Sequence, residues 1–183
     1  MNSLEAAVSL KYTFKPYSKS FPKLFTSEKH FLSKLFSSIK EKEIHHIGST
    51  SVPTLGGKGI IDIIVVVPKK SIAKAKKLLK NGEFVYHHTL RRKRSFHYKY
   101  YEDARNFPRL VHLHLTYFGS GELEKALAFR DYLRTHPKER KAYEKVKRQA
   151  SKLHSKNGKK YVKYKLKFVL GLMKKATEWY NSN

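Results

Sequence analysis

A glycine-rich loop that leads into an acidic, β-branched strand is the segment of this sequence best suited to chemistry. It runs from His46 to Val67 with the sequence HIGSTSVPTLGGKGIIDIIVVV. Small residues such as those of Gly48-Ser49-Thr50 let backbone N–H groups approach an anion closely, and a following helical turn would add its positive dipole end. The segment therefore predicts a phosphate-binding loop, although a tight loop with a helix cap at Ser49 or Thr50 has the same sequence.

Asp62 is the only acidic residue between Ser49 and Val67. A carboxylate on so apolar a strand needs a partner, because burying it unpaired costs several kcal/mol. A metal ion would meet this need, and so would an ion pair with Lys58 or with a basic residue elsewhere. The sequence leaves both alternatives open.

Two histidines supply a second candidate cluster. His112 and His114 lie two positions apart on a predicted strand, so both imidazoles project from one face. Beside Asp62 they would form a ligand set suited to Zn, Mn or Fe more than to Mg. They could instead bind phosphate, act as acid and base near neutral pH, or form a structural pair across the sheet. We predict Asp62, His112 and His114 as catalytic and metal-binding residues.

The C-terminal third offers further basic groups. Arg130 could form a structural pair with its neighbour Asp131 or present its guanidinium to phosphate. Lys163 and Lys167, four positions apart, share one face of a predicted helix that could line a cleft or be solvated.

A basic run from Arg91 to Arg94 precedes alternating aromatic residues from Ser95 to Tyr101. Such a hairpin could hold a phosphate backbone and stack bases, although aromatic side chains on strands are more often core.

Composition narrows the class of protein. Of 183 residues, 40% are hydrophobic and 13% aromatic, which is too apolar for a disordered chain. With no cysteine, disulfides and thiolate zinc sites are excluded, whereas ten histidines leave other metal sites open. The formal charge of +26 favours polyanionic partners such as RNA, or reflects solvated lysines on helices. No segment has the length of a signal peptide or membrane span, so we expect a cytoplasmic protein with no membrane partner.

Hydrophobic periodicity predicts strands first and helices last, which favours an α+β fold. We expect a core at 1–120 and a helical part at 121–183, packed as one compact unit. A β-α-β unit is expected around the helix that follows Ser71 and ends at Asn81-Gly82. Strands are predicted at 10–18 (or an extended arm), 43–47, 60–67, 84–88, 95–101 and 109–117, and further helices after Ser20 and at 122–135, 138–155 and 159–180.

The sequence resembles the GrpB family, a member of the polymerase-β-type nucleotidyltransferase superfamily. The likeness spans nearly the whole chain and consists of three separated motifs in order. The matching residues are His46, Gly48-Ser49-Thr50, Val52-Pro53, Lys58, Ile61-Asp62-Ile63, His112-Leu113-His114 and the segment Phe129 to Pro137, with Tyr143, Lys147, Tyr161, Lys163 and Lys167 matching more loosely.

The resemblance implies a nucleotidyltransferase-like mixed β-sheet flanked by helices, with the Gly-Ser loop leading into the Asp-bearing strand. In nucleotidyltransferases of this type the Gly-Ser turn holds the triphosphate, and carboxylates on adjacent strands hold two divalent ions. The metal pair is normally Asp-x-Asp. Here Ile64 stands two residues after Asp62, so a second carboxylate would have to come from Glu102, Asp103 or Asp131.

The predicted function has two alternatives. The first is an enzyme that binds a nucleoside triphosphate, or another phosphorylated small molecule, and transfers a nucleotidyl group to an unknown hydroxyl with a divalent metal, Mg or Mn or else Zn. The second is a non-catalytic protein of the same fold that binds RNA or another polyanion. The predicted phosphate- or nucleotide-binding residues are His46, Gly48, Ser49, Thr50, Lys58, Arg130, Lys163 and Lys167.

Overall fold

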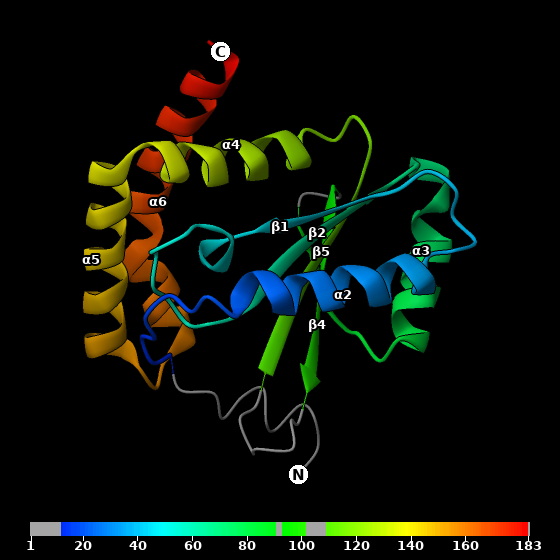
Figure 1. Ribbon diagram of the computed structural model, residues 1–183, viewed down its shortest axis with the longest axis horizontal. Coiled ribbons are helices and arrows are strands. Elements are labelled where there is room, and N and C mark those ends of the chain that lie inside the picture. Colours follow the sequence, from blue (N-terminus) through cyan, green and yellow to red (C-terminus); the bar gives the residue numbers. More distant parts are fainter. Residues whose placement is uncertain (1–11, 91–92, 102–108, 183) are drawn as a thin grey trace.

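The computed structural model describes residues 12–90, 93–101 and 109–182. Their centre is a five-stranded mixed sheet with the strand order β1-β2-β5-β4-β3 (Figure 1). Only the β2–β5 pair is parallel. The strands are β1 (Glu43–Ile47), β2 (Ile61–Val67), β3 (Val85–Leu90), β4 (Arg94–Tyr101) and β5 (Arg109–Tyr117).

Two helices cover one face of the sheet and form the main core with it. They are α2 (Phe21–Leu35) and α3 (Ile72–Asn81) (Figure 1). Because side chains alternate between the faces of a strand, every second residue of β2 and β5 enters this core. The core contains Ile61, Ile63, Val65 and Val67 from β2 and Val111, Leu113 and Leu115 from β5, with Leu32, Ala75 and Leu79 from the helices.

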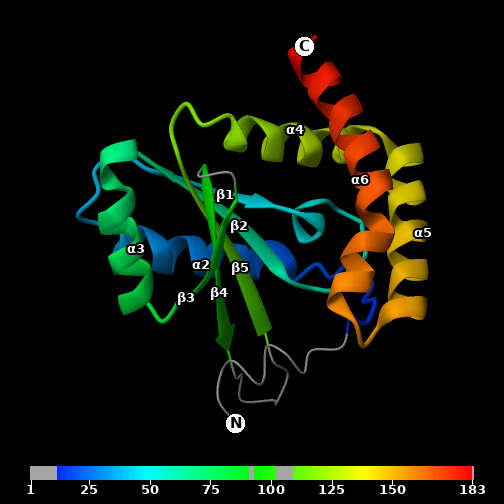
Figure 2. The same cartoon turned by 180° about the vertical axis from the view of Figure 1, so that it is seen from behind.

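The alternate residues of the same strands face the opposite side, where the candidate chemistry lies. In the β2–β5 register Asp62 pairs with His112, and Ile64 pairs with His114. Ile64 and Val66 pack with residues of α4 (Glu122–Thr135), which crosses above the sheet (Figure 2). The parallel pairing therefore brings an acid and an imidazole together from segments fifty residues apart.

The C-terminal helices α5 (Pro137–His154) and α6 (Gly158–Asn181) lie side by side beyond the end of the sheet (Figure 2). They pack on the loop between β1 and β2 through a second apolar cluster. This cluster joins Val52 and Leu55 of the loop to Tyr143 of α5 and Leu172 of α6, and it also includes Tyr132 and Leu133 of α4. The helical part therefore closes over the glycine-rich loop.

The predicted α+β class is confirmed, and the structure decides two local points. In the described part of the predicted strand 10–18, only an isolated bridge between Lys15 and Gly57 forms, so the segment is an extended arm. The strand after α3 does not pair with β2; the β4 and β5 strands lie between them, and β3 takes the edge. None of the described helices is both long and apolar enough to cross a membrane.

Candidate functional site

A small cavity of about 220 Å³ opens between the glycine-rich loop, the sheet and the C-terminal helices. We call it the basic cavity. It is lined by Gly48, Ser49, Lys58, Ile60, Asp62, His112, Phe129, Tyr143, Lys147, Tyr161 and Lys165. Five of these residues come from α4, α5 and α6, so the cavity exists only because the helices fold back onto the loop.

The turn at Gly48 requires glycine for two reasons. Its φ of +68° is a conformation that L side chains rarely adopt. A Cβ at this position would also overlap the Asp62 carboxylate, whose Cγ would lie 2.9 Å away. The small-residue turn and the lone acid are therefore in close contact. The 3₁₀ helix η1 (Ser49–Ser51) that follows has three residues, too short for an appreciable dipole.

Asp62 is paired with His112 across the parallel strands. His112 Nδ1 and Asp62 Oδ1 lie 3.1 Å apart, and the two side chains are 19% and 24% exposed. Burial acts to raise the pKa of Asp62, but the hydrogen bond and charge of His112, together with the charges of His114 and Lys58, outweigh it and lower the pKa. Asp62 is therefore ionised and fixes the orientation of the His112 ring.

Three lysines surround this single carboxylate. Lys58 Nζ lies 4.8 Å from the centre of the Tyr12 ring, and Lys165 Nζ lies 4.5 Å from that of Tyr161. Lys147 Nζ lies 4.9 Å from the centre of the Tyr143 ring. The direct ion pair between Lys58 and Asp62 that the sequence leaves open is not formed. Three ammonium groups against one carboxylate leave the basic cavity with excess positive charge, which favours an anion.

Lys147 is the most enclosed of the three. It is 3% exposed, and its Nζ has no hydrogen-bond partner among the described residues. Burial, with the charges of Lys165 and Lys58, lowers its pKa to about 7 against the opposing charges of Asp62 and Glu144. Ser49 Oγ and Lys147 Nζ both lie within 2.8 Å of the position that a Cβ at Gly57 would occupy. The ammonium group therefore lies close to the Ser49 hydroxyl and is left to be satisfied by a ligand.

His46 and Thr50 have structural positions instead of lining the basic cavity. Thr50 Oγ1 donates to the Ile60 carbonyl at 2.9 Å, and His46 Nε2 donates to Thr50 Oγ1 at 3.0 Å. The His46 ring stacks on Phe25 at 4.6 Å, and burial lowers its pKa to about 4. A neutral imidazole that donates to Thr50 fixes the start of the loop, and His46 does not line the basic cavity.

Arg130 likewise holds the loop in place. It donates twice to Asp131, at 2.8 and 2.9 Å, and once to the His46 carbonyl at 3.2 Å. Arg134 adds two hydrogen bonds to the Ser51 carbonyl, and Glu144 accepts from the Gly56 amide at 3.1 Å. Asp131 is thereby occupied by Arg130 and is not a second metal-binding carboxylate beside Asp62.

His114 and the predicted metal cluster are separate from the basic cavity. His114 does not line it; its ring packs on Phe96 at 5.2 Å, and its buried Nδ1 has no hydrogen-bond partner in the part of the chain that the structure describes. Burial lowers the pKa of His114 to about 3. Among the residues that the structure describes, no three His, Asp, Glu or Cys side chains are grouped to hold a metal ion. One carboxylate that already accepts from His112, among three ammonium groups, does not fit a two-ion site.

The remaining predicted residues lie elsewhere. Lys163 and Lys167 are exposed on α6, and Lys167 borders a groove between α5 and α6. Glu102, Asp103, Arg91 and Arg92 lie outside the described residues.

Sequence reasoning did not place Lys147 or Lys165 among the site residues, although Lys147 matches the family pattern loosely and helical periodicity gives a signal for both. Lys165 lies four residues after Tyr161 and seven before Leu172, both of which are buried. Lys147 follows the buried Tyr143 by four residues. A lysine at a position where helical periodicity requires an apolar residue is a candidate ligand-binding group, whereas Lys163 and Lys167 lie off that stripe.

Comparisons with known proteins identify the family of this chain. A family model described as "GrpB protein" matches residues 11–175. The UPF0157 protein YqkA of Bacillus subtilis is 29% identical over 89% of this chain, which spans only 46% of that relative's length. The UPF0157 protein BH1888 of Halalkalibacterium halodurans is 30% identical and covers 90% of this chain and 82% of its own.

Solved structures have the same fold. The crystal structure of the conserved protein GrpB from Enterococcus faecalis has a TM-score of 0.77 and 28% identity, covering 91% of this chain and 98% of that chain. A Cid1 poly(U) polymerase structure with Mg 3′-dATP bound has a TM-score of 0.50 and 12% identity, covering 87% of this chain and 51% of that chain. At this identity the likeness establishes the nucleotidyltransferase-like fold alone.

Proposed function

The chain belongs to the GrpB family, and on that premise we propose that it is an enzyme that binds a nucleoside triphosphate by its phosphates in the basic cavity and transfers a nucleotidyl group to a hydroxyl acceptor. The observation that carries the proposal is the buried ammonium group of Lys147 beside Ser49, for which the described residues offer no hydrogen-bond partner. A buried charge costs several kcal/mol unless it is paired, and a phosphate oxygen would pair it.

The lining residues divide the work between charge and orientation. Lys58, Lys147 and Lys165 neutralise the phosphate oxygens, and the Ser49 hydroxyl donates to one of them. At about 220 Å³ the basic cavity has room for the phosphates, while the nucleoside extends beyond it. The nucleotide is the ligand class that the nucleotidyltransferase-like fold favours, and a smaller phosphorylated metabolite fits the same groups.

The Asp62–His112 pair supplies the acid–base chemistry of the proposed transfer. Asp62 accepts a hydrogen bond from His112 Nδ1 and so orients the ring, and in the neutral form of the ring Nε2 takes the proton of the acceptor hydroxyl. The hydroxyl oxygen then attacks the α-phosphorus, and the bond to the β-phosphate oxygen breaks to release pyrophosphate. The negative charge that develops on the leaving pyrophosphate lies beside the three lysines, which stabilise this charge. A divalent ion enters this scheme only as part of the triphosphate substrate.

Two variants separate binding from transfer. We expect Lys147→Gln to weaken ATP binding about tenfold or more, because a charge-assisted hydrogen bond is lost. Lys145→Gln on the exposed face of the same helix removes the same charge and serves as the control. Asp62→Asn should bind ATP with unchanged affinity but should no longer release pyrophosphate. The release assay contains a pool of alcohols and nucleic-acid ends as hydroxyl acceptors. Calorimetry with and without Mg²⁺ measures the binding.

The proposal fails if Lys147→Gln binds ATP as tightly as the control does. If Asp62→Asn loses ATP binding only in samples that contain Mg²⁺, Asp62 acts in the site by binding a metal ion. RNA as a partner of the whole surface remains a prediction from the charge of +26.

A further inference from the structure

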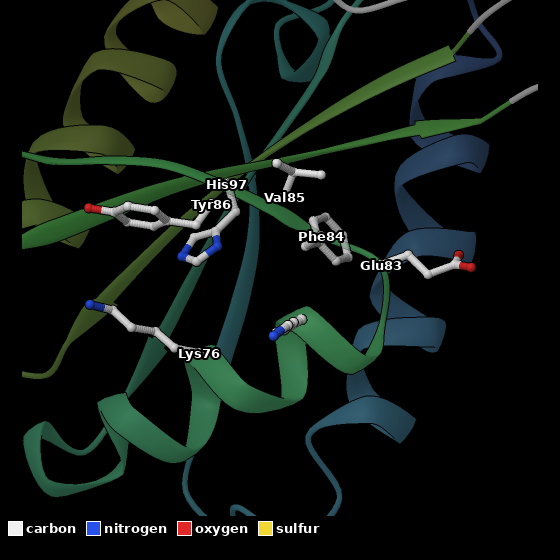
Figure 3. A pocket seen from close by; sticks show the side chains of 7 residues that line it. Lys76, Glu83, Phe84, Val85, Tyr86 and His97 are labelled. Atoms are coloured by element: carbon white, nitrogen blue, oxygen red, sulfur yellow. The ribbon is translucent and has the colours of Figure 1, made fainter. Parts of the chain in front are cut away.

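A second hollow of about 580 Å³ lies between α3 and the edge strand β3, on the opposite face of the sheet from the basic cavity. We call it the α3 pocket. It is lined by Lys76, Lys80, Glu83, Phe84, Val85, Tyr86 and His97 (Figure 3). Its volume is within the range of small-molecule sites, which is about 300–1,000 Å³.

The polar group at the base of the α3 pocket is unsatisfied. His97 projects from β4 toward α3 in Figure 3 and is 2% exposed. Its Nε2 pairs with Ser95 Oγ at 3.0 Å, whereas its Nδ1 has no hydrogen-bond partner among the described residues. Burial and the charge of Lys76 lower the pKa of His97 to about 4, so the ring is neutral and its Nδ1 can donate or accept according to the tautomer.

The charge of the α3 pocket is uncompensated. Lys76 and Lys80 lie one turn apart on α3, and neither has an ion pair within the described part of the chain. The carboxylate of Glu83, the only acidic residue in the lining, is 2.9 Å from Lys99 Nζ and points away from the other side chains in Figure 3. Two ammonium groups therefore face a ligand without competition from an acid.

An aromatic wall completes the α3 pocket. Tyr86 pairs with His97 across the β3–β4 strands, and their rings meet edge to face at 5.5 Å. Tyr86 is 53% exposed, so one face of its ring is open to a stacking partner. Lys76 Nζ lies 5.8 Å from the centre of the same ring. A planar group on Tyr86 would consequently have its anionic substituent near Lys76.

We propose that the α3 pocket binds a nucleotide unit, with the base on Tyr86 and against His97 Nδ1 and the phosphate on Lys76 and Lys80. The two ammonium groups match the charge of a phosphate, and base edges supply both donors and acceptors for a neutral imidazole. Stacking of a base on an aromatic side chain tolerates any base. The unit is either a free nucleotide or one residue of a single strand, which have this chemistry in common.

The test follows the imidazole resonances of the full chain by NMR, with His97 assigned through the neighbouring Tyr86 ring. The probes are adenosine monophosphate, a single-stranded hexanucleotide, adenosine and inorganic phosphate. We expect saturable shifts of His97 with the nucleotide, the strand or both, and smaller ones with adenosine or phosphate alone. Whichever of adenosine monophosphate and the hexanucleotide binds more tightly shows whether the ligand is a free nucleotide or part of a single strand.

Matched variants locate the effect. Lys76→Gln with Lys80→Gln should weaken binding about tenfold or more. Lys70→Gln with Lys77→Gln removes the same charge outside the lining and should change it less than twofold. Lys147→Gln should leave the His97 response intact, which separates the α3 pocket from the basic cavity. The proposal is overturned by an unmoved His97, by equal losses in both double variants, or by phosphate acting as well as the nucleotide.

Discussion

The basic cavity and the α3 pocket carry lysines in opposite surroundings. Lys147 in the basic cavity is buried and has no hydrogen-bond partner among the described residues, whereas Lys76 and Lys80 at the α3 pocket extend from an exposed helix face. Water already solvates Lys76 and Lys80, so replacing these two lysines should hardly change the free energy of unfolding. The buried, unpaired charge of Lys147 destabilises the folded protein when no anion is bound. In the free protein, the buried lysine of the basic cavity therefore lowers stability, whereas the exposed lysines of the α3 pocket do not.

The largest expected effect tests whether the basic cavity depends on close packing at its turn. We expect Gly48→Ala to lower the free energy of unfolding by about 2–4 kcal/mol, because a Cβ would overlap Asp62 and the φ of +68° is unfavourable for alanine. Gly119 has a φ of +79° and no atom within 4 Å of a Cβ, so Gly119→Ala isolates the backbone term at about 1 kcal/mol. Urea unfolding measures both, and equal losses would contradict the close approach of Asp62.

The second prediction addresses the enclosed lysine directly. Lys147→Met should raise the free energy of unfolding of the ligand-free protein by about 1–3 kcal/mol at pH 6, since an apolar side chain replaces an unpaired buried charge. The same change at exposed Lys76 should stay within about 0.5 kcal/mol.

The pH dependence of this gain has a definite sign. Lys147 has a pKa of about 7 in the folded protein, below the usual 10.5, so the folded wild-type protein gains stability as pH rises from 7 toward 10.5. The advantage of Lys147→Met should therefore shrink over that range in urea titrations. A Lys147→Met protein that is less stable than wild type at pH 6 would mean that the ammonium group has a partner in the free protein.

These two sites also mark the limits of prediction from sequence. Periodicity locates the strands and most helices, because an amphipathic pattern directly records which face is buried. The contact of Gly48 with Asp62 was predictable, since both lie on one short loop and strand. Strand order was not, because local pattern does not say that β5 would pair with β2 and displace β3 to the edge.

The candidate residues differ in the same way. His112 was selected and pairs with Asp62, whereas His114, two residues on, lies outside the basic cavity beside Phe96. Chemistry alone cannot separate two identical side chains on one strand face. Lys163 and Lys167 were preferred to Lys165 by motif, although the helical stripe of Tyr161 and Leu172 contains Lys165. Which lysine faces inward is decided by tertiary packing of α6 on the loop.

The smallest expected effect is the pH dependence of anion binding in the basic cavity, where the enclosed lysine titrates near neutrality. Sulfate keeps its charge across the range and is therefore the probe. Below pH 7 Lys147 is charged and binds the anion, and above pH 7 it loses its proton, so we expect the Kd to rise about tenfold between pH 6 and pH 8. Asp62 and Glu144 have lowered pKa values and stay ionised, and Tyr143, with a raised pKa, stays neutral.

Lys165, whose pKa is lowered to about 8 by burial and by Lys58, extends the loss of affinity above pH 8. In Lys147→Gln the dependence between pH 6 and pH 8 should flatten, while the weaker step due to Lys165 remains. Calorimetry in two buffers of different ionisation enthalpy should also detect proton uptake on sulfate binding by the wild type. If the wild-type Kd for sulfate does not change with pH and no proton is taken up, the ammonium group of Lys147 is solvated in the same way as those of Lys76 and Lys80. The contrast between the two sites would then be wrong.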